Sequence, residues 1–125
     1  MAKKYGLEKR INNLGNVMKV DNLPYHEFLN VASNASCILT DGGGQTEEAA
    51  FLQIPCVIFR KYNERKEAEE ENCAIRVGSN PKKAIKYVKE AVEQGEFYQK
   101  VKASKNPFGS GNAAKKIVDE IQKHI

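Results

Sequence analysis

Short apolar runs alternate along this chain with longer segments in which apolar residues recur every three or four positions. The short runs are rich in Val, Ile and Leu and cover residues 17–20, 37–40, 56–59 and 74–77. None shows clean alternation of apolar and polar residues, which is typical of strands covered on both faces. Residues 25–35, 44–53, 63–72, 81–93 and 112–124 have helical character. This alternation predicts a doubly wound α/β domain with an open parallel sheet of about four strands flanked by helices.

The ends of the predicted helices carry recognisable signals. Asn80 followed by Pro81 reads as a helix cap with proline in the first turn, and Gly95 is expected to end that helix. The chain opens on a polar segment, residues 2–12, that is expected to be helical. Because a doubly wound unit normally opens on a strand, we expect an opening strand to be missing. No repeat or linker divides residues 1–125, so a single domain is predicted.

A glycine-rich turn follows the second apolar run. Thr40 and Asp41 close the predicted strand, and Gly42, Gly43 and Gly44 lead into the next helix. Such a turn lets a ligand approach bare backbone and aims unpaired helix amides at it, an arrangement that suits phosphate. Open parallel sheets bind ligands at the carboxyl ends of their strands, where this turn lies. From the residues alone, a diphosphate site and a plain strand-to-helix turn remain equally acceptable.

Composition narrows the class of protein. The chain has 125 residues, of which 41% are hydrophobic and 29% charged, as in a globular domain with a real core. No apolar run approaches the ~20 residues that cross a bilayer, and no apolar stretch follows the first lysines. We therefore expect no membrane association, no signal peptide and a cytoplasmic location.

Charge and cysteine usage exclude further classes. The net charge of +4 mildly favours an anionic partner, but the lysines are mixed with glutamates, so we expect no nucleic-acid binding. The spacing of Cys37, Cys56 and Cys73 fits no zinc site, and their odd number argues against a disulfide framework. Buried free thiols are the expected state, and no metal site is predicted.

Three segments, in order, resemble one protein family. They are Leu-Thr-Asp-Gly-Gly-Gly-Gln-Thr-Glu-Glu-Ala at residues 39–49, Ile-Pro-Cys-Val-Ile-Phe-Arg at 54–60 with Asn-Glu-Arg-Lys-Glu at 63–67, and Asn-Pro-Phe-Gly-Ser-Gly at 106–111. Together they are similar to the C-terminal half of the UDP-N-acetylglucosamine 2-epimerases. That family typically shows Thr-Asp-Ser-Gly-Gly-Ile-Gln-Glu-Glu-Ala, then Thr-Glu-Arg-Pro-Glu, then Asn-Pro-Tyr-Gly-Asp-Gly. This chain departs from the pattern at Gly42, Gln45, Thr46, Asn63, Lys66, Phe108 and Ser110.

The resemblance implies a fold and an activity. The family has the GT-B architecture, in which a sugar nucleotide lies between two Rossmann-like domains, so the chain would be a partial C-terminal, UDP-binding domain. The implied reaction interconverts UDP-GlcNAc and UDP-ManNAc by elimination and re-addition of UDP, without a metal or redox cofactor. The family's acid and base carboxylates lie in an N-terminal domain that these residues do not contain. We therefore assign no catalytic residue here and expect no activity from this part alone.

The resemblance also implies roles for particular residues. The backbone of Gly42, Gly43 and Gly44 would cradle the diphosphate, Glu48 would bind the ribose hydroxyls, and Arg65 would lie by the phosphates or the sugar. The implied partners are a UDP-sugar and either the missing N-terminal domain or another subunit. Two alternatives stay open: the nucleotide-binding subunit of a split GT-B glycosyltransferase, and a non-catalytic remnant that forms a homo-oligomer.

Several neighbouring residues have a structural explanation that we prefer. Asp41 is expected to bond nearby backbone amides at the strand end. Glu47, about 100° around the helix from Glu48, is expected to favour the helix dipole. For Arg60 the choice between a solvent-facing ion pair and a functional role stays open. Tyr25 and Phe28 are expected in the core rather than stacked on a base.

Two further features remain. No base–nucleophile pattern surrounds His26 or His124, which are assigned to structure or solvent. The loop at residues 106–111 either connects two segments or, as its family-like form suggests, borders the cleft between domains.

Overall fold

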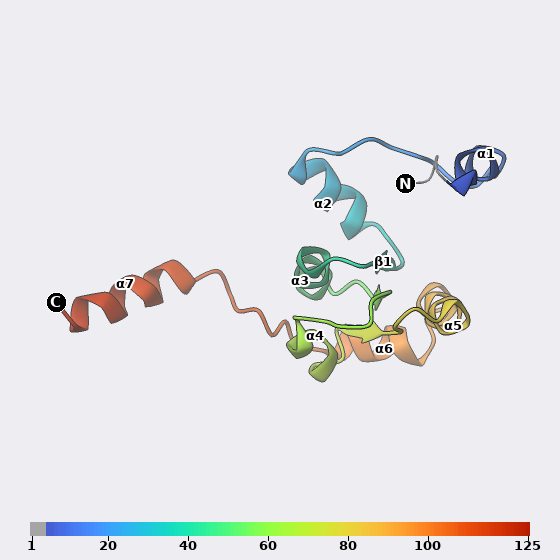
Figure 1. Ribbon diagram of the computed structural model, residues 1–125. Coiled ribbons are helices and arrows are strands. Elements are labelled where there is room, and N and C mark those ends of the chain that lie inside the picture. The colour runs from blue at the N-terminus through green and yellow to red at the C-terminus, as the bar shows by residue number, and fades with distance from the viewer. Residues whose placement is uncertain (1–4) are drawn as a thin grey trace.

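The structure is a computed structural model that describes residues 5–125, and it is built of short strands and longer helices (Figure 1). The strands are β1 (Ile38–Thr40), β2 (Cys56–Ile58) and β3 (Ala74–Arg76). The helices are α1 (Leu7–Asn12), α2 (Tyr25–Ser33), α3 (Gly43–Leu52), α4 (Lys66–Glu70), α5 (Pro81–Val92), α6 (Glu96–Ala103) and α7 (Ala113–Lys123). The predicted α/β class is therefore confirmed.

The three strands form a parallel sheet in the order β1-β2-β3. Cys56 of β2 is in register with Ile38 on one side and Ala74 on the other. A helix follows each strand in the chain: α3 follows β1, α4 follows β2 and α5 follows β3. All three strands thus end at the same edge of the sheet, and the helix that follows β1 begins there.

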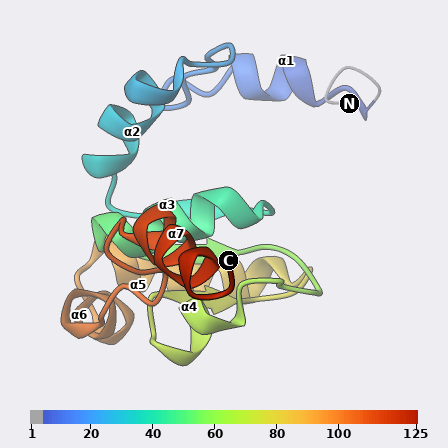
Figure 2. The ribbon, with the colours of Figure 1, turned by 90° about the vertical axis from the view of Figure 1, so that its left-hand side faces the viewer.

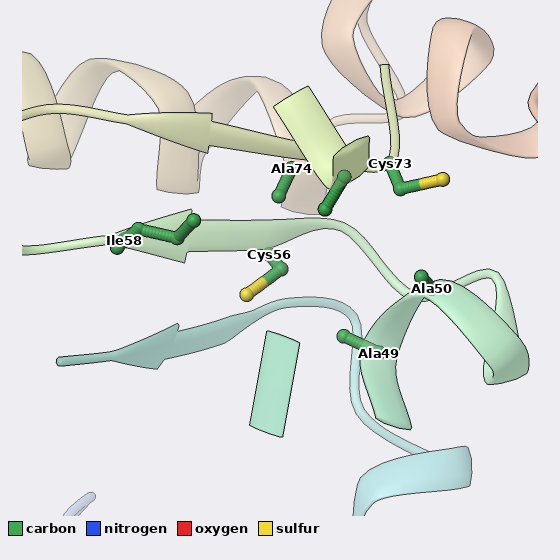
Figure 3. Packing of buried hydrophobic residues seen from close by; sticks show 7 residues of the cluster. Ala49, Ala50, Cys56, Ile58, Cys73 and Ala74 are labelled. Atoms are coloured by element: carbon green, nitrogen blue, oxygen red, sulfur yellow. The ribbon is translucent and has the colours of Figure 1, made fainter. Parts of the chain in front are cut away.

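Helices cover both faces of the central strand. One core packs α3 and α4 against β2 and β3 and contains Ala49, Ala50, Cys56, Ile58, Ala68, Cys73 and Ala74 (Figure 3). The other packs α5 and α6 and contains Val57, Val77, Ala84, Ala91, Phe97 and Val101. Successive residues of β2 alternate between the two cores because strand side chains alternate in direction. All three residues of β2 are buried, as expected for a strand covered on both faces.

The sheet has fewer strands than expected within residues 5–125. The predicted strand at residues 17–20 was wrong: this segment has no regular secondary structure and pairs with no strand in the described part of the chain. Val17, Met18 and Val20 are exposed. A strand needs a neighbour to satisfy its backbone groups, and none lies beside this segment. β1 is consequently an edge strand, and its Leu39 is 56% exposed rather than buried.

Helix α6 was not predicted, and its start explains the role of Gly95. The left-handed residue after α5 is Gln94, with φ 56°, rather than Gly95. The amide of Gly95 donates to the carbonyl of Glu90 at 2.7 Å, and an added Cβ would lie 3.3 Å from that oxygen. Gly95 then caps the N-terminus of α6, whose Phe97 and Val101 are buried. Glycine is favoured at position 95 because the Glu90 carbonyl lies too close for a side chain, and not because of its backbone angle.

The other predicted helices agree with the structure at their ends. Those at residues 25–35, 44–53, 81–93 and 112–124 are confirmed to within two residues at each end, whereas the charged segment 63–72 shortens to α4. Of the predicted opening helix, residues 2–4 lie outside the described residues, and the remainder forms α1. Asn80 accepts a hydrogen bond from the amide of Lys83 at 3.1 Å, which confirms the predicted cap of α5.

Two helices lie apart from the sheet. Helix α7 projects away from the body of the molecule, and α1 is carried on the extended segment before α2 (Figures 1 and 2). Neither helix contains a buried residue. On α7, Ile117, Val118 and Ile121 are all more than half exposed. Among residues 5–125, no helix has the length and apolar character required to span a membrane.

Candidate functional site

The glycine turn lies at the carboxyl end of β1, as predicted, but the helix begins earlier than expected. Gly42 is the N-cap of α3 with extended backbone, φ −100° and ψ 149°, and Gly43 and Gly44 already belong to the first turn. The buried hydroxyl of Thr46 donates to the carbonyl of Gly42 at 3.1 Å and fixes the turn from the core side. The turn is therefore a helix N-terminus with a defined backbone, rather than a loose loop.

The three glycine amides are not equivalent. The amide of Gly42 donates to Oγ1 of Thr40 at 3.0 Å, so it is already engaged within the protein. The first amides of a helix have no intrahelical acceptor, and no N-cap side chain replaces one here. The amides of Gly43 and Gly44 are consequently the ones available to an anion. Thr40, not the predicted Asp41, bonds the backbone at this strand end.

Gln45 closes over the start of the helix. Its Oε1 accepts a hydrogen bond from Thr40 Oγ1 at 3.4 Å. The same oxygen occupies the space that a Cβ on Gly42 would fill. Sequence reasoning did not single out Gln45, because a side chain folding back over its own helix start depends on the missing side chain at Gly42.

Arg65 lies beside the same helix start. Its Cγ is 4.0 Å from the position of a Cβ on Gly43, and its Nε donates to Oε1 of Glu47. This hydrogen bond with the Glu47 carboxylate, which also attracts the guanidinium, raises the pKa of Arg65 above its usual value. Glu47 therefore contacts a specific cation, which the helix-dipole interpretation did not foresee.

Glu48 points to a different region from Glu47, as their angular separation on the helix predicted. A cavity of about 430 Å³ lies between the segment before α2, α2 itself and α3. Its lining consists of Val20, Asp21, Asn22, Leu23, Tyr25, Phe28, Gln45 and Glu48. The Glu48 carboxylate interacts with the Tyr25 hydroxyl, and this interaction raises the pKa of Tyr25. The expected core position of Tyr25 was wrong, since this side chain is 63% exposed.

Other candidate residues take structural positions. Arg60, whose role the sequence leaves open, forms an exposed ion pair with Glu64 at 3.8 Å. In the loop 106–111, Asn106 Oδ1 accepts from the Phe108 amide at 3.0 Å, and Phe108 packs against the core beside α3 and α4. His26 and His124 are exposed and lie beside Glu27 and Glu120. Within the described residues, no three His, Cys, Asp or Glu side chains gather as a metal site.

Two of the three cysteines are buried free thiols, as expected from the sequence. All three cysteines are free; Cys56 and Cys73 are buried, and Cys37 is half-buried. Burial raises the pKa of the Cys56 thiol to about 12 and that of Cys37 to about 11. A raised pKa lowers the fraction of reactive thiolate at neutral pH, as expected for structural buried thiols.

Comparison with known proteins gives consistent matches over almost the whole chain. A family model described as UDP-N-acetylglucosamine 2-epimerase matches residues 2–122. The UDP-N-acetylglucosamine 2-epimerase of Methanocaldococcus jannaschii is 38% identical over 116 residues, which are 93% of this chain and 30% of that protein. The protein of the same name from Methanococcus maripaludis is 34% identical over 117 residues, or 94% of this chain and 30% of that protein.

A solved structure is similar over the same extent. The crystal structure of the M. jannaschii UDP-GlcNAc 2-epimerase in complex with UDP-GlcNAc and UDP matches with a TM-score of 0.83 at 34% identity. The match covers 98% of this chain and 32% of that one. The chain therefore spans about a third of the length of the relatives it matches.

Proposed function

Because the chain belongs to the UDP-N-acetylglucosamine 2-epimerase family, we propose that it is the part of such an enzyme that holds the UDP group of the sugar nucleotide. In this proposal residues 1–125 are one Rossmann-like, UDP-binding domain, and the catalytic acid and base come from the rest of the protein. The single observation that carries the proposal is the start of α3. There, two helix amides lack a side-chain cap, and the Arg65 side chain passes beside Gly43.

The diphosphate would bind at this helix start. The amides of Gly43 and Gly44 would donate to phosphate oxygens, helped by the positive end of the helix dipole. Gly42 would let the diphosphate approach the backbone closely, but it would not donate a hydrogen bond to it, since its amide already donates to Thr40. Arg65, beside Gly43, would add a permanently charged guanidinium whose forked donors match phosphate geometry.

The nucleoside would lie in the adjacent cavity. Glu48 and Gln45 line it next to the helix start, so a diphosphate on Gly43 and Gly44 would place its ribose near Glu48. Ribose hydroxyls would then donate to the Glu48 carboxylate in place of the Tyr25 hydroxyl. The ring of Phe28 and the freed ring of Tyr25 would offer apolar area to the base.

In the proposed reaction, the residues of this chain act on the leaving group. Loss of the C2 proton and cleavage of the bond between C1 and the diphosphate oxygen would release UDP and give a glycal. UDP would then add back to C1 as a proton returns to the opposite face of C2. Negative charge grows on the diphosphate as its bond to C1 breaks, so fixed amides and a guanidinium stabilise that step. No metal or redox cofactor enters this proposal.

The remaining two thirds of the family fold are the proposed partner of this domain. Ile117, Val118 and Ile121 of α7 are each more than half exposed, and the structural match covers 98% of the chain. We propose that α7 packs against the rest of the protein. A separate subunit and a second copy are the alternative occupants. The free thiols accord with a cytoplasmic location, which we retain as part of the proposal.

Isothermal titration of the protein with UDP tests the site. Replacing one partner of a charge-assisted hydrogen bond costs about 1.5–3 kcal/mol, so Glu48→Ala and Arg65→Ala should each weaken UDP binding about 10- to 100-fold. Glu96→Ala and Lys100→Ala are matched controls, because these residues form an exposed ion pair on α6. Binding that is equal in all four variants would refute the site assignment.

A further inference from the structure

Arg65 is held at two points, and this constraint is more specific than a surface ion pair requires. At the backbone, Asn63 Oδ1 accepts from the Arg65 amide and Asn63 Nδ2 donates to the Arg65 carbonyl, both at 3.0 Å. Asn63 Nδ2 also donates to Oε1 of Glu69 at 2.8 Å, which ties this turn to α4. The start of the Arg65 side chain is thus fixed relative to α4.

The far end of the side chain is fixed by α3. Nε of Arg65 donates to Glu47, which lies four residues after Gly43 and therefore on the same face of the helix. The side chain consequently runs along the first turn of α3, with its Cγ beside Gly43. A side chain at position 43 would compete for that space, so the glycine and the glutamate together define where the guanidinium lies.

This arrangement leaves most of the guanidinium free. Arginine has five N–H donors, of which Nε carries one. Among the described residues, Arg65 makes its side-chain hydrogen bond through Nε, and both Nη groups have no protein acceptor. The pair is also partly open, with Arg65 and Glu47 side chains 38% and 40% exposed, so its contribution to folding is small. An ion pair that stabilises little but fixes a donor group fits a binding site better than a structural tie.

We propose that Glu47 is a positioning residue that holds Arg65 across the start of α3, with the two Nη groups left to donate to a diphosphate. The inference rests on the proposed function, and it assigns to Glu47 a role different from that of its neighbour Glu48. Glu47 itself would not contact the ligand.

The direction in which Glu47→Ala changes the affinity for UDP separates this proposal from a purely electrostatic effect of the carboxylate. Glu47 carries a negative charge close to an anion site, so a carboxylate with no positioning role would repel UDP, and Glu47→Ala would tighten binding. If Glu47 positions Arg65, Glu47→Ala should weaken UDP binding by about tenfold, because the flexible arginine must be ordered again on binding. Glu47→Gln keeps an oxygen acceptor for Nε and should restore affinity to within about threefold of the original protein.

Two further titrations and an unfolding measurement complete the test. Uridine, which lacks phosphates, should bind equally to the original protein and to Glu47→Ala. In an Arg65→Ala background Glu47→Ala should not weaken UDP binding further, since its positioning effect acts through Arg65, and loss of the unpaired carboxylate should leave the affinity equal or slightly higher. Thermal unfolding of each variant should remain close to that of the original protein.

The outcomes distinguish this inference from the function on which it rests. If the original protein binds no UDP, the proposed function fails. If the original protein binds UDP and Arg65→Ala weakens that binding, while Glu47→Ala tightens it or leaves it unchanged, the positioning role fails and the proposed function stands. Additive effects of Glu47→Ala and Arg65→Ala would likewise overturn the positioning role.

Discussion

At the scale of single residues, Gly42 illustrates how one missing side chain shapes the site. Its backbone, at φ −100°, is accessible to any amino acid, so its conformation does not require glycine. The space of its absent Cβ is filled by Oε1 of Gln45. Gly42 and Gln45 therefore behave as a complementary pair, and a side chain introduced at position 42 should displace the side chain of Gln45.

Substitution at Gly42 tests this pairing. In a Gln45→Ala background, Gly42→Ala should change the free energy of unfolding little, because the gain of about 0.4–1 kcal/mol from a less flexible unfolded chain is offset by the poorer fit of alanine at the N-cap of α3. With Gln45 present, the same substitution should destabilise the protein, since the amide end of Gln45 must rotate away and lose its bond to Thr40. Urea unfolding of the four proteins measures the difference. An equal effect in both backgrounds would contradict the pairing.

The buried thiols predict a loss of stability in alkali. The folded pKa values of about 11 for Cys37 and about 12 for Cys56 lie above the usual value near 9.0. Because the folded pKa values are raised, the stabilisation is fully present below about pH 8.5 and is lost as pH rises through the folded values. The free energy of unfolding should fall from about pH 9 upward. A Cys56→Ala variant should show a shallower fall, and an unchanged slope would contradict this origin.

At the scale of elements, local patterns predicted well where the element is decided by its own residues. Asn80 with Pro81 fixes the start of α5, and the three glycines mark the start of α3 within one residue. The prediction of a strand at residues 17–20 failed because a segment becomes a strand only when a neighbouring segment pairs with it. Helix α6 was missed although Phe97 and Val101, four residues apart, carry a helical signal. Its eight residues are too few for that periodicity to stand out.

The caps of α5 and α7 provide a matched pair for prediction. Asn80 accepts the Lys83 amide, whereas Asn112 at the N-cap of α7 makes no side-chain cap bond. Asn80→Ala should therefore destabilise the fold by about 1 kcal/mol, and Asn112→Ala should have a much smaller effect. Chemical denaturation of both variants measures the free energy of unfolding. Equal effects would show that the side-chain bond of Asn80 is not the source of the difference.

At the scale of the whole molecule, the candidate site combines what the chain predicts locally with what only folding brings together. The glycines and Glu48 lie on one short segment, so their proximity followed from a helix start. The pairing of Glu47 with Arg65 joins residues 18 positions apart, and it depends on β2 running parallel to β1. The contact between Tyr25 and Glu48 likewise depends on α2 lying beside α3. No periodicity along the chain encodes either contact.

The same scale explains the exposed face of α7. An amphipathic helix is stable in water when its apolar face is covered, and Ile117, Val118 and Ile121 are uncovered here. Without the remaining part of the family fold, these 125 residues should therefore associate with themselves, giving a mass above the 14.0 kDa of one chain by light scattering. Combining Ile117→Lys with Ile121→Lys should return the mass to that of one chain. Asp119→Lys, which alters charge on the opposite face of α7, should leave the association intact. A single-chain mass before any substitution would contradict the need for a cover on α7.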